Sequence, residues 1–486
     1  MSSVDQRVSP ATSGIAPGRL LRSFPSVLSI VVVGFASLCA AYLVTHGRTH
    51  LAVAAIVAAP LGVFLLGRAS RGLLLATLLV LLVPFTYTLG LRQASVPRVG
   101  AFLALMAVAI AAYEGRERMR LAAVDLAVAA FVGLGLVSWQ LATHPPHSLR
   151  ATVNFLIPFA FYVAARRFAR GESEAIRWVL LAGGAIGSLT LYYEFFVTHQ
   201  PLWVDRAAYY WNSGGSFIFR PGGVFGSPPG AATILAMTSL CGLPLAWDTA
   251  GRRRLAARVC LALSIGALAL TFTRGPFIAF VAGLIVYVLL LRPASWGRLV
   301  FGTAVVGLLL ALVVLPRISS AAWYQKGVLR GGTLAARQSY WALSWPLITN
   351  SREHLLLGHG INSLVVGRPE LPGTIDPDIA TVPTLSIRGP HNQYVRTLLE
   401  EGLVGLGLLL AWLLGAGAMG ARAAWRATTT VRPFLAAGTA ALASVAIGGL
   451  VDDVLRHPPT FAVVAVITGM VVSRSQPAAT VGMSLG

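Results

Sequence analysis

The stretch RGPHNQYVRTLLEEGLVG, from Arg388 to Gly405, is where a polar cluster runs directly into a long apolar segment. Gly389 and Pro390 predict a helix start, because proline is tolerated in a first turn, where its missing N–H would have had no partner. His391 is then expected at the positive end of the helix dipole, which favours the neutral imidazole that a general base needs. Taken alone, a histidine at a helix start is more often only an interfacial residue.

The composition excludes an ordinary soluble domain. Hydrophobic residues make up 56% of the 486 residues, charged residues only 11%, and the mean hydropathy is +0.74. Many apolar runs reach the roughly 20 residues that a helix needs to cross a bilayer. We therefore predict an all-α integral membrane protein, a polytopic helical bundle of about 12–14 transmembrane helices with one long extracytoplasmic loop that contains short helices.

Apolar runs that could span the membrane recur along most of the chain. They lie at 26–45, 50–67, 72–91, 99–113, 121–142, 151–168, 177–197, 228–247, 255–273, 276–291, 298–315, 391–414, 432–451 and 459–473. This pattern predicts a cytoplasmic disordered tail (1–25), an N-terminal transmembrane bundle (26–315), a long extracytoplasmic loop (316–390), C-terminal transmembrane helices (391–474) and a cytoplasmic tail (475–486).

The net charge of +21 is explained by topology better than by nucleic-acid binding, because the basic residues form short clusters between the apolar runs. Most of these arginines fall on the side of the N-terminus when the spans alternate. Since positive charge in short loops marks the cytoplasmic face, both termini are predicted to be cytoplasmic and residues 316–390 to face outward.

The long loop contains a segment with helical periodicity. Arg337, Trp341 and Trp345 are spaced at i, i+4 and i+8, so one helical face would carry a guanidinium beside two indoles. Such a helix is expected to lie along the membrane interface, where tryptophan is favoured. It could be purely structural.

Two further arginines are predicted on the outward face. Arg220 lies in the turn-forming stretch Phe219-Arg-Pro-Gly-Gly-Val-Phe-Gly-Ser-Pro-Pro-Gly230, which could also be a simple helix-entry loop. Arg274 lies in Thr271-Phe-Thr-Arg-Gly-Pro-Phe277, a tight hairpin between two spans. A lipid headgroup contact would explain Arg274, but ionisable residues at membrane depth usually mark a functional site.

Other clusters carry weaker signals. The three cysteines, at 39, 241 and 260, lack metal-site spacing, and Asp376 and Asp378 match an acidic metal motif without the nucleotide-binding fold that such motifs serve. A turn between the last two spans carries Asp452, Asp453, Arg456 and His457. These four could neutralise one another, which we favour, or hold acceptor hydroxyls.

The motifs together resemble those of the bacterial O-antigen ligase and O-antigen polymerase family. The pattern H-N-x-Y-x-x-x-L-x-E-x-G-x-x-G is carried by His391, Asn392, Tyr394, Leu398, Glu400, Gly402 and Gly405. The segment that starts at Arg220 matches the family motif R-x-x-G-x-F-x-x-P. The segment around Arg274 matches T-x-S-R-G, with Thr273 in place of serine. Arg337 precedes the tryptophan segment and a glycine-rich L-G-x-G turn, as in the family. Departures occur at Val395 and at Pro229, where leucine and asparagine are usual.

The resemblance implies a glycosyltransferase that moves a glycan from an undecaprenyl-diphosphate-linked donor to an acceptor hydroxyl, on the outer face of the bacterial cytoplasmic membrane. The acceptor would be a lipid core oligosaccharide, a growing polysaccharide or a protein. No cofactor, metal or nucleic acid is expected. The implied site has a catalytic residue, His391; diphosphate-binding residues, Arg220, Arg274 and Arg337; and supporting residues, Asn392, Tyr394, Glu400 and Arg388. Arginine suits diphosphate because its guanidinium pairs bidentately with phosphate oxygens and stays charged.

A membrane transporter of an anionic solute or a lipid-linked sugar is the alternative. The outward arginines would then form a binding vestibule, and His391 would relay protons. That hypothesis predicts inverted repeats and polar residues near mid-membrane, neither of which is evident in the sequence.

Overall fold

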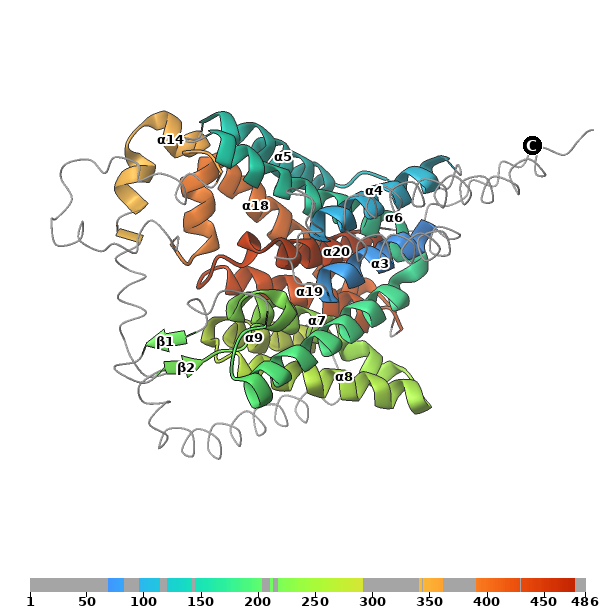
Figure 1. The fold of residues 1–486 in the computed structure, drawn as a ribbon. Helices are drawn as coiled ribbons and strands as arrows, with labels where there is room; N and C mark the ends of the chain where they lie inside the picture. Colours follow the sequence, from blue (N-terminus) through green and yellow to red (C-terminus); the bar gives the residue numbers. More distant parts are fainter. Residues whose placement is uncertain are drawn as a thin grey trace, which may run out of the picture. The chain divides into compact units, whose positions relative to one another are not determined.

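The structure is a computed structural model, and it describes residues 69–82, 96–113, 120–141, 145–202, 210–212, 217–291, 341–342, 344–361, 390–428 and 430–476. The chain divides into two compact units, residues 1–71 and 72–486. Nearly all the described residues belong to the second unit, whose helices are labelled in Figure 1.

Helices dominate the described residues, so the predicted all-α class is confirmed. They are α3 (Ala69–Leu82), α4 (Val96–Tyr113), α5 (Ala123–Ser138), α6 (Pro145–Tyr193), α7 (Pro228–Asp248), α8 (Gly251–Leu270), α9 (Arg274–Leu291), α14 (Arg352–Leu357), α18 (Gln393–Arg426), α19 (Arg432–Gly448) and α20 (Pro458–Ser475). Two short strands, β1 (Tyr210–Asn212) and β2 (Phe217–Phe219), pair antiparallel with Tyr210 opposite Phe219.

Among the described residues, six helices are long and apolar enough to cross a membrane, which confirms a multi-pass membrane protein. They cover Ala123–Leu141, Phe155–Thr198, Pro228–Asp248, Arg274–Leu291, Gln393–Arg426 and Pro458–Ser475. Each predicted span that falls on described residues coincides with a helix in whole or in part. The runs at 26–45, 50–67 and 298–315 lie outside the described residues, so the total of 12–14 spans stays a prediction.

Helix α6 joins two predicted spans, 151–168 and 177–197, through a bend. The backbone leaves helical values at Glu172, with φ −118° and ψ 21°. Phe155 in the first half packs edge-on against Phe461, near the start of α20, and Glu194 just beyond the second half binds the backbone at Gly222 and Gly223. Both ends of α6 therefore return to one end of the bundle, and the bend lies at the other.

The helices of the second unit have two opposite ends, which we name after one residue each. The His391 end holds the starts of α7, α9, α18 and α20, the end of α8 and the end of α19 (Figure 1). The Arg177 end holds the bend of α6, the starts of α5 and α19 and the end of α20, joined by contacts such as Arg166 to Asp125 and Arg474 to Ser173. Between them, Trp412 stacks on Phe461 in the buried core.

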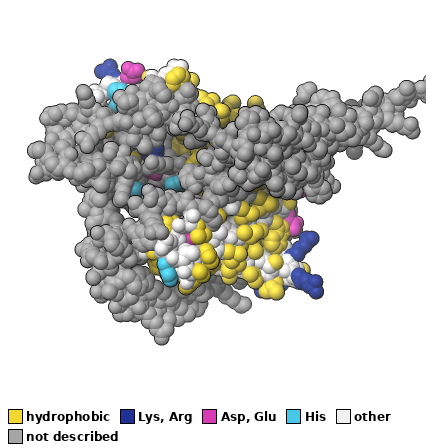
Figure 2. All heavy atoms as spheres, viewed as in Figure 1, with side chains coloured by type: hydrophobic (Ala, Val, Ile, Leu, Met, Phe, Trp, Pro, Cys, Tyr) yellow, Lys and Arg dark blue, Asp and Glu magenta, His cyan; other side chains and the backbone are white. Residues whose placement is uncertain are grey.

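The described surface over α8 and α9 is mostly hydrophobic, as expected of helices that face lipid (Figure 2). Exposed side chains along these helices include Leu255, Val259, Ile278 and Ile285. Lys and Arg side chains appear at one edge of that surface.

A glycine contact breaks α18 two residues beyond the motif residue Glu400. Gly402 has φ 68°, and a Cβ there would lie 2.2 Å from the backbone oxygen of Leu356. The two carbonyls that the break releases are satisfied from the L-G-x-G turn, where His359 N–H donates to Leu399 O and Gly360 N–H donates to Glu400 O, each at 2.9 Å. The glycines of the two motifs therefore allow two backbones to touch.

Replacing Gly402 by alanine is expected to destabilise the protein. The substitution forces a left-handed backbone on a residue with a Cβ, at a cost of about 1–3 kcal/mol, and adds a clash with Leu356. Gly407→Ala on the same helix is the matched control, because its Cβ would meet nothing within 4 Å. Thermal unfolding in detergent should give a midpoint several degrees lower for Gly402→Ala and an unchanged or higher midpoint for Gly407→Ala; equal midpoints would contradict the contact.

Candidate functional site

Helix α18 begins at Gln393, and Asn392 caps it. The Asn392 side-chain oxygen accepts hydrogen bonds from the N–H groups of Tyr394 (2.9 Å) and Val395 (3.1 Å). The prediction that Gly389 and Pro390 start the helix is therefore wrong by three residues, because a capping asparagine defines the start more strongly than a tolerated proline. His391 lies one residue before the cap.

The start of α18 is tied to the turn between α19 and α20. Asn392 Nδ2 donates to Leu450 O (3.0 Å), and Gln393 N–H donates to Gly449 O (2.8 Å). Gln393 Oε1 also accepts from Leu455 N–H (2.9 Å). Two consecutive residues thus hold both sides of the turn, which we call the 449–457 turn.

His391 faces this turn in a strained backbone conformation. Its φ is 47°, a left-handed value that costs a non-glycine residue about 1 kcal/mol or more. The strain is held from both sides, since Trp341 Nε1 donates to Pro390 O (2.9 Å) and Asn392 is fixed by the cap. Strain of this kind often accompanies function, because it fixes a side chain in a position that relaxed backbone would not give.

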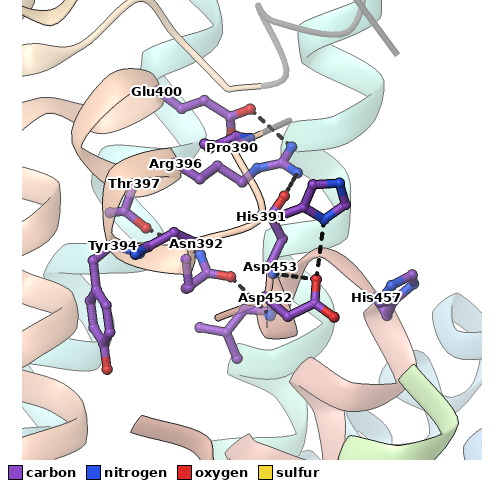
Figure 3. Close-up of polar contacts among 12 residues, drawn as sticks. Pro390, His391, Asn392, Tyr394, Arg396, Thr397, Glu400, Asp452, Asp453 and His457 are labelled. Atoms are coloured by element: carbon purple, nitrogen blue, oxygen red, sulfur yellow. Dashed lines mark hydrogen bonds and ion pairs between the residues drawn. The ribbon is translucent and has the colours of Figure 1, made fainter. Parts of the chain in front are cut away.

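The His391 ring lies beside a carboxylate. Nδ1 is 3.6 Å from Asp452 Oδ1, and the other ring nitrogen points away from Asp452 (Figure 3). At this distance the contact is electrostatic rather than a hydrogen bond. The side chains are 32% and 18% exposed, so a substrate can reach the imidazole while the carboxylate is partly shielded.

The groups around Asp452 favour its ionised carboxylate. Burial raises the pKa of this carboxyl, but the neighbouring His391, the N–H of Asp453 at 2.9 Å and the more distant His457 outweigh burial, so that its pKa lies below the ordinary value. His457 is fixed in turn at 3.3 Å from Ser227, the cap of α7. The 449–457 turn is therefore also attached to the segment that follows Arg220.

Two of the family-motif residues make scaffold contacts. Glu400 accepts from Arg396 Nη2 at 2.9 Å, and Arg396 Nη1 lies 3.5 Å from Asp453, with all three side chains buried. Tyr394 donates its hydroxyl to Ala446 O at 2.6 Å. These contacts fix α18 against the 449–457 turn from inside the bundle.

Arg220 and Arg274 come from neighbouring segments. Arg220 Nε donates to Thr271 O (3.1 Å), three residues before Arg274. The start of α9 packs against the 449–457 turn, because a Cβ on Gly275 would lie 2.5 Å from Val451. The two arginine segments and the His391–Asp452 pair thus meet at the same end of the bundle.

Glu194 is a residue that the sequence analysis missed. Its carboxylate is almost fully buried and accepts three backbone hydrogen bonds, from Leu202 (3.0 Å), Gly222 (3.0 Å) and Gly223 (2.8 Å). It therefore fixes the loop that follows Arg220. A signal was present, because a lone acidic residue in the apolar run 177–197 is costly unless it binds something.

Two predicted site residues, Arg337 and Arg388, lie outside the described residues. Within the residues that are described, no group of three or more His, Cys, Asp or Glu side chains could hold a metal ion. What the described residues offer chemically is an imidazole oriented by a carboxylate, near two arginine segments. That combination suits proton removal from a hydroxyl beside a phosphate-bearing leaving group.

Glu194→Gln is expected to loosen the loop after Arg220. Glutamine keeps one oxygen, but its NH₂ must face backbone N–H groups, so at least one buried donor loses its partner at a cost of about 1–3 kcal/mol. Glu174→Gln is the control, since Glu174 is exposed. Limited proteolysis should cut Glu194→Gln faster between residues 202 and 223 than either the control or the native protein; equal cutting in all three would contradict this role.

Comparison with known proteins agrees with the motifs. Residues 259–410 match a family model described as O-antigen ligase. That range contains Arg274, His391 and the α18 motif, whereas Arg220, Glu194 and Asp452 fall outside it. No curated protein matches the chain. The match confirms the resemblance over residues 259–410: this part of the multi-pass membrane protein is similar to O-antigen ligase, which supports the O-antigen ligase/polymerase family.

Proposed function

We propose that the protein transfers a glycan from an undecaprenyl-diphosphate-linked donor to an acceptor hydroxyl. The observation that carries this proposal is the meeting of His391, oriented beside Asp452, with the Arg220 and Arg274 segments at one end of the bundle. The O-antigen ligase match supports glycan transfer at a membrane. Donor and acceptor identity are part of the proposal.

The reaction is a single displacement. His391 accepts the proton of the acceptor hydroxyl on the ring nitrogen that points away from Asp452, and the oxygen attacks the anomeric carbon of the donor. The bond from that carbon to the diphosphate oxygen breaks, and its electron pair leaves with the diphosphate. The ionised Asp452 stabilises the imidazolium that forms, as a carboxylate beside a catalytic histidine does in other folds.

Arg220 and Arg274 bind the diphosphate. Negative charge grows on the leaving group as the bond breaks, so fixed guanidiniums stabilise the transition state more than the ground state. Arg337, four residues before Trp341 in the sequence, is expected to join them, since Trp341 contacts the backbone next to His391. Arg388 is expected to support the same site. These cations supply the charge compensation for which other transferases use a metal, so the reaction is proposed to be metal-independent.

The His391 end is proposed to face outward, on the outer surface of the bacterial cytoplasmic membrane, with both termini cytoplasmic. The predicted bias of arginine toward the opposite face supports this orientation. The acceptor is either the end of a growing polysaccharide or a lipid core oligosaccharide. A polymerase would lengthen the donor glycan, and a ligase would join it to a different lipid, so the two products differ in size and in the lipid they carry.

The first test is turnover of a lipid-diphosphate-linked oligosaccharide by the purified protein with a candidate acceptor. The native protein should release undecaprenyl diphosphate, and His391→Ala should lower the rate by at least about 100-fold, because positioned acid–base groups contribute about 10²–10⁴. Arg274→Ala should lower turnover with a folded protein, whereas Arg252→Ala, an exposed arginine on α8, should have no effect.

The general-base assignment would be wrong if His391→Ala turned over at the native rate. The transporter alternative would replace the transferase if no preparation consumed the lipid-linked glycan while reconstituted liposomes showed solute flux. Activity that disappears in chelator and returns with a divalent cation would contradict metal independence.

Asp452→Asn is expected to lower turnover near neutral pH, because the asparagine keeps the shape of the side chain but removes the negative charge that stabilises the imidazolium in the transition state. Asp452 supplies that charge at neutral pH, since its pKa is depressed below the ordinary 3.8. A folded Asp452→Asn variant that turns over at the native rate would show that the charge does not act on His391.

A further inference from the structure

Two guanidiniums share one aromatic ring at the Arg177 end. Arg177 Cζ lies 4.8 Å from the centroid of Phe434, and Arg474 Cζ lies 5.6 Å from it. Both also bind Ser173, since Arg177 Nε donates to Ser173 O (3.3 Å) and Arg474 Nη2 donates to Ser173 Oγ (2.6 Å). The bend of α6, the start of α19 and the end of α20 thus hold two positive charges close together.

Neither charge has a counterion among the described residues. Arg166 nearby pairs with Asp125 at 2.8 Å, and Arg396 at the His391 end pairs with Glu400 at 2.9 Å, whereas Arg177 and Arg474 make no ion pair with any described carboxylate. Arg474 Nε is also buried without a hydrogen-bond partner in the described part of the chain. Two adjacent, partly desolvated cations repel each other, so the pair is incomplete without an anion.

The carboxylates nearest to Arg177 do not fill this role. Glu174 and Asp248 act on Arg177 only at longer range, and both are exposed. Glu174 faces Arg253 instead, at 3.8 Å. A nearby guanidinium adds further positive charge, because Arg170 donates to Ser473 O and to Gln476 O at the end of α20.

The position of the pair indicates the source of the anion. Tryptophans at this end, Trp247 at the end of α7 and Trp425 at the end of α18, are 61% and 55% exposed. Exposed tryptophan near the ends of spanning helices is typical of the headgroup region of a bilayer. The guanidiniums of Arg177 and Arg474 belong to the same end of the bundle, so we expect them at the depth of phospholipid phosphates.

We propose that Arg177 and Arg474 together bind the phosphate of an anionic phospholipid from the leaflet that adjoins the Arg177 end. Each guanidinium presents a fork of donors that suits phosphate oxygens, and Phe434 and Ser173 hold both in place for one ligand. General attraction of positive loops to the membrane surface does not explain the pair. Arg252 and Arg426, which such attraction alone would explain, are exposed and share no aromatic ring or serine with another arginine among the described residues.

The test measures the thermal midpoint of the purified full chain in detergent as phosphatidylglycerol is titrated in. Phosphatidylglycerol should raise the midpoint of the native protein, and phosphatidylcholine and inorganic phosphate should raise it much less. In the double variant Arg177→Gln/Arg474→Gln, apparent binding should weaken by at least about tenfold, since charge-assisted hydrogen bonds are lost. The double variant Arg252→Gln/Arg426→Gln removes the same net charge and should retain the native response.

Three results would overturn the proposal: no midpoint shift with phosphatidylglycerol in the native protein, an equal shift with phosphatidylcholine, or equal weakening in both double variants. A shift with inorganic phosphate as large as with the lipid, lost only in Arg177→Gln/Arg474→Gln, would assign the site to free phosphate and overturn the lipid as its source. If the first double variant cannot be purified, Arg474→Gln alone is compared with Arg426→Gln by the same titration. Glycan transfer plays no part in this measurement, so its outcome is independent of the proposed function.

Discussion

The site depends on the attachment of the α18 start to the 449–457 turn by Asn392 and Gln393. Asn392 is satisfied at both ends of its amide, since its oxygen caps α18 and its nitrogen binds Leu450 O. Gln393 adds bonds to Gly449 and Leu455. Because buried amides are costly unless fully hydrogen-bonded, these contacts specify one register between helices that are far apart in sequence.

Every other feature of the site follows from that register. It brings Asp452 beside His391, and it presents Val451 to Gly275 at the start of α9. The hydrogen bond from Arg220 to Thr271 then attaches the loop that follows Arg220 to the site. Glu194 fixes the same loop by accepting a hydrogen bond from Gly223. The left-handed backbone conformation of His391 is stable only because hydrogen bonds fix both neighbouring residues, Pro390 and Asn392.

The sequence was sufficient to predict the fold class, the described spans and the motif around His391. Long apolar runs have one stable arrangement in lipid, so helices such as α7 and α20 could be placed without knowing their neighbours. The motif residues allowed the resemblance to be recognised, because they are residues needed either for the reaction or for a close contact between segments. The Gly402 break shows this, since its glycine is needed where the backbones of two segments meet.

Contacts between distant segments could not be predicted in the same way. Asp452 was one of four polar residues in a turn, and nothing in its spacing indicated that it would face His391, 61 positions earlier in the numbering. The helix start at Gln393 was missed because a proline and an asparagine both favour helix starts, and only the cap hydrogen bonds decide between them. The pairing of Arg177 with Arg474 likewise depends on the bend at Glu172, which apolar periodicity does not encode.

The proposed mechanism requires that the donor diphosphate binds at the His391 end. The most direct measurement uses a lipid-diphosphate-linked glycan with a photoreactive group beside the diphosphate, followed by mapping of the labelled peptides. Labels are expected in residues 219–230, 271–277 and 390–394, with competition by unlabelled donor. Competable labelling confined to the Arg177 end, around residues 170–178 and 474–476, would contradict it.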